Sequence, residues 1–224
     1  MRKGDGMLLS SVISLGLEYD VRQDGTAIVT SIGSCTDKDI VIPQFYEGKT
    51  VVAIAPDAFA RQNEIVSIKL PVSVTVIGKN AFAWCRSLKV VIASGILDIG
   101  AKAFIGCDSL SDLALGKKLR RIGIKAFAYC PSLTSALLPN SICEMGVSAF
   151  EGCRNLNTVV LPENLKVVEN GTFYACTSLK HVDIPENLKY IDEYAFAYCT
   201  SLDMIDISRR TVTNKNAFFE SKIA

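Results

Sequence analysis

Ile122-Gly123-Ile124-Lys125-Ala126-Phe127-Ala128-Tyr129-Cys130-Pro131-Ser132-Leu133 is the stretch that decides the fold, because most of it recurs along the chain. Its phenylalanine has equivalents separated by 22 or 23 residues: Phe59, Phe82, Phe104, Phe127, Phe150, Phe173, Phe196 and Phe218. A fixed period of roughly 20–29 residues is typical of solenoids, in which each repeat forms one coil. The sequence therefore predicts a stack of coils.

Apolar residues occupy the same positions in every copy of the repeat. Three residues after the phenylalanine, six copies have a cysteine: Cys85, Cys107, Cys130, Cys153, Cys176 and Cys199. Six residues after it comes a leucine, and further apolar residues recur on both sides. A single coil cannot bury all these side chains, so we expect equivalent ones to stack in columns, with Phe104, Phe127 and Phe150 one above another.

The repeat also predicts local structure. The Leu-x-x-Leu-x-Leu spacing of Leu110, Leu113 and Leu115 alternates at its end and predicts one short strand per coil, and strands of successive coils then stack in parallel. The Ala-Phe-x-x-Cys segment is long enough for one helical turn or a short helix. We therefore expect an α/β solenoid, a right-handed curved stack with short parallel strands, one helical turn or short helix per ~23-residue repeat, and an N-terminal β-hairpin cap.

The N-terminal region departs from the repeat. Residues 1–16 are expected to be a tail, whose basic start and modest apolar stretch faintly resemble a degenerate secretory signal without an evident cleavage site. Residues 17–50 are expected to form a β cap. Alternating segments on either side of the Asp24-Gly25 turn predict a hairpin, and Ile40–Pro43 imitates the strand of a repeat.

The solenoid itself is assigned to residues 51–224, with a partial repeat at its C-terminal end. Ahead of Phe218, polar Arg210 and Thr213 replace residues that are apolar in the other copies. The segment from Met204 to Ile207 is therefore expected to be an incompletely covered sheet edge, and such edges favour pairing with another chain.

Composition excludes several classes of protein. Apolar residues make up 49% and charged residues 21%, as in ordinary globular proteins, and the formal net charge is +1. This charge gives no overall attraction to nucleic acid or to an anionic membrane. No apolar run approaches the roughly 18 residues that a membrane span needs.

Eight cysteines could indicate disulfides, but their positions favour free thiols. Six lie at one repeated core position, where side chains stacked in parallel have the wrong direction for a bridge. Buried thiols acting as small apolar groups are the better interpretation. Cys35 and Cys143 lie outside this column, and we expect reactive thiols only there. Cys143 is expected to be exposed, because its repeat position holds polar or basic residues in other copies, namely Thr75, Arg120, Lys166 and Lys189.

The repeat wording Ile-Gly-x-x-Ala-Phe-x-x-Cys-x-Ser-Leu, followed by x-x-Val-x-Leu-Pro, resembles the BspA-type leucine-rich-repeat family over roughly residues 40–219. The hairpin around Asp24-Gly25 resembles a segment that often precedes such repeats. Similar proteins are surface or secreted proteins of host-associated bacteria and some protozoa, and several are adhesins. The resemblance implies a cell-surface or secreted location, although a cytoplasmic one stays open without a clear export signal.

Few residues in the sequence point to catalysis. His181 is the only histidine, and a Ser/His/Asp arrangement with Ser178 and Asp183 would place all three in one short segment without a nucleophile motif. The cysteine spacing does not fit a metal site, and phosphate-binding fingerprints are absent from the sequence. The basic run Lys117–Arg121 indicates either an anionic docking patch or a solvated loop. We therefore expect a non-enzyme without cofactor or metal, and no nucleic-acid partner.

The outward side of the predicted strands carries the candidate binding residues. Apolar residues form its centre and charged residues one end: Val90, Ile92, Ala114, Leu137, Val160, His181, Asp183 and Asp206. Apolar patches rimmed with charge often mark partner sites, although strands favour such residues in any case. We expect a non-enzymatic protein-binding or adhesion-type module whose partner is a protein, such as a host extracellular or surface protein, or a glycan. The alternatives are an assembly module that associates end to end through its C-terminal edge, and a hydrolase centred on His181.

Overall fold

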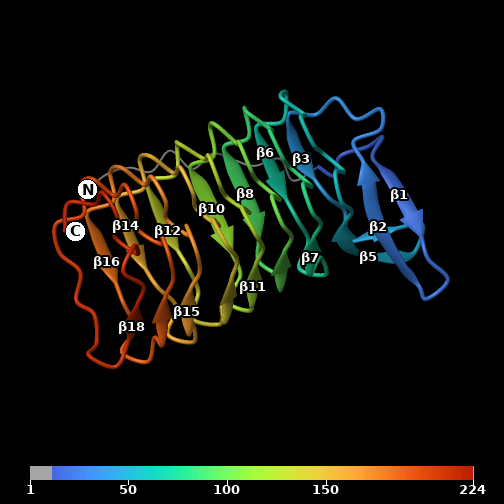
Figure 1. Ribbon diagram of the computed structural model, residues 1–224. Coiled ribbons are helices and arrows are strands. Elements are labelled where there is room, and N and C mark those ends of the chain that lie inside the picture. The colour runs from blue at the N-terminus through green and yellow to red at the C-terminus, as the bar shows by residue number, and fades with distance from the viewer. Residues whose placement is uncertain (1–11, 224) are drawn as a thin grey trace, which may run out of the picture.

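The computed structural model describes residues 12–223 and shows a solenoid, in which the chain advances coil by coil from one end of the stack to the other (Figure 1). The first part of the expected tail, residues 1–11, lies outside the described residues. A typical coil contributes one strand to a first sheet and a shorter strand to a second sheet, and a turn around the repeat phenylalanine joins them. We call the outer surface of the first sheet the strand face, and that of the turns the turn face.

The first sheet consists of the strands that the leucine pattern predicts. In stacking order they are β3 (Asp39–Val41), β6 (Ser67–Lys69), β8 (Val90–Ala93), β10 (Asp112–Leu115), β12 (Ser135–Leu137), β14 (Thr158–Val160) and β16 (His181–Asp183). Hydrogen bonds join them in two groups, β3-β6-β8-β10 and β12-β14-β16, and every pair is parallel. The predicted parallel strands are confirmed, including the repeat-like strand of the cap.

The second sheet was not predicted beyond its hairpin. Its strands are β1 (Glu18–Val21), β2 (Thr26–Ser31), β4 (Phe45–Tyr46), β5 (Lys49–Ile54), β7 (Val76–Ile77), β9 (Asp98–Ile99), β11 (Arg121–Ile122), β13 (Glu144–Met145), β15 (Val167–Val168), β17 (Tyr190–Ile191) and β18 (Val212–Thr213). β1 and β2 form the predicted antiparallel hairpin, and β2 then pairs in parallel with β5. The hairpin therefore extends the second sheet beyond the first regular coil.

The predicted helical turn or short helix in each repeat is wrong, because residues 12–223 contain no helix. In the fourth coil, Lys125 and Tyr129 have left-handed φ angles of 54° and 57°, and residues two before and two after most other phenylalanines do the same. A helix needs consecutive right-handed residues, so these positions interrupt it. The Phe127 N–H instead donates to the Ala149 carbonyl of the next coil at 2.8 Å.

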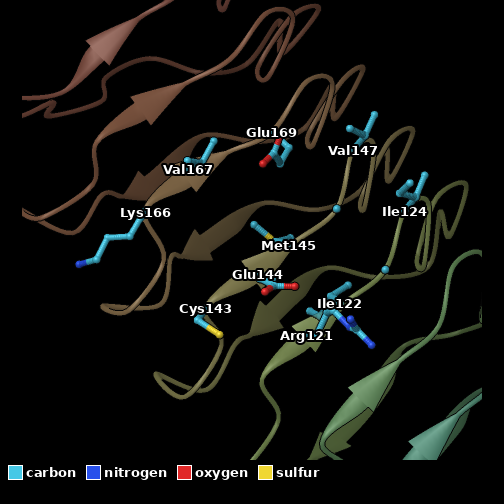
Figure 2. Close-up of a pocket in the computed structure, with 12 residues that line it drawn as sticks. Arg121, Ile122, Ile124, Cys143, Glu144, Met145, Val147, Lys166, Val167 and Glu169 are labelled. Atoms are coloured by element: carbon cyan, nitrogen blue, oxygen red, sulfur yellow. The ribbon is translucent and has the colours of Figure 1, made fainter.

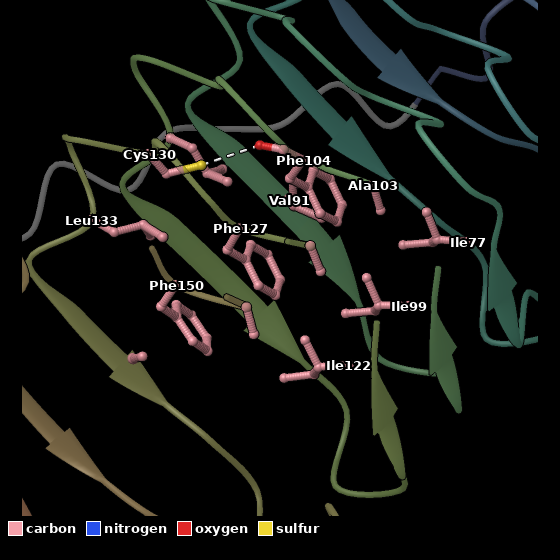
Figure 3. Close-up of a cluster of buried hydrophobic side chains, with 14 of the residues drawn as sticks. Ile77, Val91, Ile99, Ala103, Phe104, Ile122, Phe127, Cys130, Leu133 and Phe150 are labelled. Atoms are coloured by element: carbon pink, nitrogen blue, oxygen red, sulfur yellow. Dashed lines mark hydrogen bonds between the residues drawn. The ribbon is translucent and has the colours of Figure 1, made fainter. Parts of the chain in front are cut away.

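The phenylalanines form the predicted column in the core (Figure 3). The ring centroids of Phe104 and Phe127 are 5.3 Å apart with planes 3° from parallel, and Phe127 and Phe150 are also 5.3 Å apart. Parallel rings at this centroid distance are offset, which is a favourable arrangement for aromatic pairs. The seven phenylalanines from Phe59 to Phe196 are fully buried. The central inference from the repeat is confirmed.

The cysteines beside this column are free thiols, as predicted. Each also makes a hydrogen bond that the sequence did not reveal: Cys130 Sγ donates to the Phe104 carbonyl of the preceding coil at 3.1 Å (Figure 3). The other five do the same to the equivalent phenylalanines. Cys143 is exposed as predicted, whereas Cys35 is buried, and burial disfavours reaction of its thiol.

The last coil departs from the regular repeat in both sheets. Thr213 pairs with Ile191 in the second sheet and is exposed, and Phe218 stacks on Phe196 with centroids 5.4 Å apart. On the first sheet, an isolated bridge from Met204 to His181 replaces a full strand, and the Met204 side chain is 73% exposed. The first sheet thus has an exposed edge beyond β16.

Candidate binding surfaces

The strand face presents the predicted binding residues on its outer side. Val90 and Ile92 come from β8, Ala114 from β10, Leu137 from β12, Val160 from β14, and His181 and Asp183 from β16. The register places Ala114 beside Ile92, and separately Leu137 beside Val160 and Val160 beside Asp183. Asp206 follows in the segment beyond the isolated bridge. β10 and β12 are not paired, so the row of residues is interrupted between Ala114 and Leu137.

Exposure differs strongly along this row. Leu137 is 83% exposed and Val160 45%, whereas Val90 and Ile92 are half-buried. A large apolar side chain so open to water contributes little to folding, because it keeps most of its hydrated surface. The apolar part of the strand face that is available to a partner therefore centres on Leu137 and Val160.

The polar end of the strand face contains a contact between a histidine and a carboxylate. His181 Nε2 lies 2.8 Å from Asp183 Oδ1, and both side chains are more than half exposed. In the last coil, Lys222 forms an ion pair with Asp203. Within residues 12–223, His181 has no hydroxyl or thiol partner that would complete a nucleophilic triad. The geometry gives the histidine a carboxylate neighbour on an open surface.

A groove of about 480 Å³ lies on the second sheet, where sequence analysis placed no site. Figure 2 shows its lining side chains on three successive coils. They are Arg121, Ile122, Gly123, Ile124, Cys143, Glu144, Met145, Gly146, Val147, Lys166, Val167 and Glu169. The floor is apolar, and charged side chains and the Cys143 thiol form the rim.

This groove lies where the second sheet divides, since β13 and β15 are not paired. In four earlier coils the residue four before the phenylalanine is glycine; a Cβ on Gly146 would come within 2.6 Å of the Ile124 nitrogen. In the sixth coil this position holds Glu169, and a residue with a Cβ cannot pack on the preceding coil as directly as Gly146 does. The next coils carry Asp192 and Asn214 there and pair among themselves as β15-β17-β18. The sheet therefore divides where the residue type changes.

The turn face carries exposed aromatic side chains that sequence analysis also missed. Trp84 and Tyr129 lie two residues after their phenylalanines, and each ring packs over the glycine at that position in the next coil. A Cβ on Gly106 would come within 2.2 Å of the Trp84 ring, and one on Gly152 within 2.6 Å of the Tyr129 ring. The available signal was this alternation of aromatic residue and glycine at one repeat position.

Charged groups surround Tyr129 on the turn face. Its hydroxyl donates to Glu151, which also lies 3.0 Å from Lys125 Nζ. Partial burial alone would raise the pKa of Glu151, but hydrogen bonds from Tyr129, Lys125 and Ser148 outweigh it and lower the pKa. The hydrogen bond to Glu151 raises the pKa of Tyr129. This part of the turn face is thus closed by its own side chains.

Two further features bear on the class of site. Within residues 12–223, no three histidine, cysteine or acidic side chains lie close enough together to hold a metal ion. In the same part of the chain, no helix has the length and apolar character needed to cross a membrane.

Comparison with known proteins identifies the repeat. The model of the BspA type leucine rich repeat region matches residues 30–153 and 120–224, with six copies. Among solved structures, the T. pallidum leucine rich repeat protein has 31% sequence identity and a TM-score of 0.77, and the match covers 84% of this chain and 88% of that one. A Bacteroides ovatus leucine-rich repeat protein shares the fold with 24% identity and a TM-score of 0.68, over 90% of this chain and 60% of that one.

A comparison with curated proteins found no match. The family match extends over most of the sequence and agrees with both the repeat motif and the stacked coils. This chain belongs to the BspA-type leucine-rich-repeat family.

Proposed function

We propose that this protein is a non-enzymatic binding module that holds a partner protein against its strand face. The observation that carries the proposal is the 83% exposure of Leu137 beside Val160, on the neighbouring parallel strands β12 and β14. Apolar side chains that fold packing does not use, next to charged residues, are the usual composition of protein-binding patches. His181 and Asp183 supply the polar rim on the C-terminal side.

Membership of the repeat family supports a protein partner for the strand face. We propose that this partner is an extracellular or host-surface protein and that the protein itself is secreted or lies at the cell surface. Val90, Ile92, Ala114 and Asp206 extend the proposed contact along the strand face. A glycan is the alternative partner at the same face, where Ser135 and Thr158 place hydroxyl groups on the strands of Leu137 and Val160.

The test is a surface-plasmon-resonance screen of the protein against purified extracellular-matrix and plasma proteins. We expect at least one to bind, and Leu137→Asp to weaken that binding by about tenfold or more, because a charge then enters the contact. Val72→Asp is the matched control, since Val72 is 66% exposed but lies outside the strands. Unchanged affinity of a folded Leu137→Asp variant would reject this surface.

A second candidate function is assembly through the C-terminal edge. The exposed Met204 and the single bridge beyond β16 favour it, because unpaired strand edges associate readily. Sedimentation velocity at rising protein concentration should then show oligomers that Met204→Lys abolishes. A monomer at all concentrations would remove this candidate.

A further inference from the structure

The turn face contains a hollow, separate from the strand face, that has the composition of an anion site. Arg61, Asn63, Trp84 and Arg86 line it, and its volume is about 390 Å³. Arg61 and Trp84 occupy the same repeat position in neighbouring coils, two residues after the phenylalanine, and Asn63 and Arg86 share the position four after it. The stack of coils therefore brings residues 23 apart in the sequence into one site. We call it the turn-face hollow.

Trp84 is the only tryptophan of the chain, and its backbone and ring are both constrained. Its φ angle is 63°, a left-handed conformation that bulky residues rarely adopt. The ring packs over Gly106, where any side chain would collide with it. It nevertheless stays 39% exposed. A large aromatic surface is thus held in place while part of it remains open to a ligand.

The polar side-chain groups of Arg61, Asn63 and Arg86 in the turn-face hollow are almost all hydrogen-bond donors. Within residues 12–223, no carboxylate lies at ion-pairing distance from Arg61, and Arg86 reaches Asp108 only at 3.7 Å on an exposed surface. The Asn63 Oδ1 already accepts the Arg86 backbone N–H at 3.1 Å. Among the described residues, this leaves the Asn63 amide NH₂ and the Arg61 guanidinium without a partner, and the Arg86 guanidinium with one exposed ion pair. Such a set favours a ligand rich in acceptors and carrying negative charge.

We propose that the turn-face hollow binds an acidic sugar residue of the uronic or sialic acid class. A guanidinium can hold the sugar carboxylate through two parallel hydrogen bonds. The Asn63 amide can donate to a ring hydroxyl, and the apolar C–H face of the ring can pack on the indole. The volume is at the small end of ligand sites and suits one such ring. Ser87 and Ser109 share the adjacent repeat position and offer hydroxyl groups along which an attached saccharide could continue.

The test uses the fluorescence of Trp84, which reports from this site alone because the chain has no other tryptophan. The probes are 3′-sialyllactose and a hyaluronan tetrasaccharide, with lactose as the neutral control and inorganic phosphate and AMP as non-sugar anions. We expect a saturable change of emission with at least one acidic saccharide. Lactose should cause none, and phosphate and AMP should bind at least about tenfold more weakly.

Matched variants distinguish saccharide binding in the turn-face hollow from non-specific attraction to positive surface charge. Arg61→Gln and Arg86→Gln should each weaken saccharide binding about tenfold, because each removes a charged donor. Arg154→Gln should leave binding unchanged, since Arg154 has the repeat position of Arg86 in a coil outside the hollow. These arginines are exposed, so the variants are expected to fold, which circular dichroism checks.

The outcomes decide the proposal independently of the strand face, because Leu137→Asp should not affect the fluorescence change. No saturable response to either saccharide up to about 10 mM would overturn the site. Equal binding of phosphate would show a general anion site, and tighter binding of AMP a nucleotide site; either would overturn the sugar assignment. An equal loss in Arg154→Gln would also overturn it, because binding would then follow surface charge.

Discussion

Each columnar cysteine combines two properties that explain its repetition. Its side chain is small enough for a column in which every coil supplies one, and its thiol donates to a carbonyl that would otherwise lack this partner. Alanine would fill less space and donate nothing, and leucine would not fit beside the phenylalanine rings without moving them. The residue is therefore used here as a small apolar group with a weak donor.

Burial of this column predicts how many thiols react in the native protein. With a thiol-specific disulfide reagent at about pH 8, we expect one fast-reacting group, Cys143, because the reactive species is an accessible thiolate. All eight cysteines should react after denaturation. Cys143→Ser should reduce the native count to zero. Two or more fast thiols in the native wild type would contradict the observed burial.

At the scale of the coil, glycine at the position four before the phenylalanine determines how closely the second-sheet segments approach. A Cβ on Gly123 would come within 2.6 Å of the Ala101 nitrogen. We therefore expect Gly123→Ala to lower the free energy of unfolding by about 1–3 kcal/mol, because backbone and not a movable side chain must shift. Urea denaturation measures the change.

Glu169→Ala is the matched control for this prediction. Position 169 already carries a Cβ beside the unpaired strands β13 and β15, so a shortened side chain adds no collision. We expect its free energy of unfolding to stay within about 0.5 kcal/mol of the wild type. Equal destabilisation by the two variants would mean that close approach does not explain the divided sheet.

The coil also shows which elements a sequence can reveal. The strands of the first sheet were predictable because apolar and polar residues alternate over several positions in every copy. Strands such as β11, with two residues, are too short to show alternation. The helical turn was predicted wrongly because nothing in the residue types of Lys125 or Tyr129 indicates a left-handed φ. Hydrogen bonds to the next coil impose that conformation, and they exist only in the stack.

The candidate sites also divide into those that residue spacing reveals and those that only the stacking of coils creates. Side chains of the strand face were assigned to one outer surface from their spacing, since residues two apart in a strand point to the same side. The turn-face hollow could not be found this way, because Arg61 and Trp84 meet only through the conformation of two turns. The groove on the second sheet could not be predicted without the packing of the coils. Glu169 has the repeat position at which Gly146, one coil earlier, packs directly on the preceding coil.

At the scale of the whole molecule, the column of buried thiols is expected to make the free energy of unfolding fall as the pH rises into the alkaline range. Burial raises the pKa of Cys85, Cys153 and Cys199 to about 12, and burial raises the pKa of Cys107, Cys130 and Cys176 well above the usual value. In the unfolded chain these thiols lose their protons near pH 8.5, so above that pH the unfolded state binds fewer protons than the native one. Their contribution to stability is complete below this pH and is lost as the pH rises through the raised pKa values of the native thiols.

We therefore expect the urea midpoint to fall steadily between about pH 9 and pH 11, each columnar thiol contributing up to about 1.4 kcal/mol per pH unit. Cys130→Ser should make the fall shallower, because serine can donate to the same carbonyl but does not titrate in this range. Cys143→Ser should leave the slope unchanged, since that thiol is exposed. A midpoint that is constant over this range would mean that the column ionises as easily in the native solenoid as in the unfolded chain.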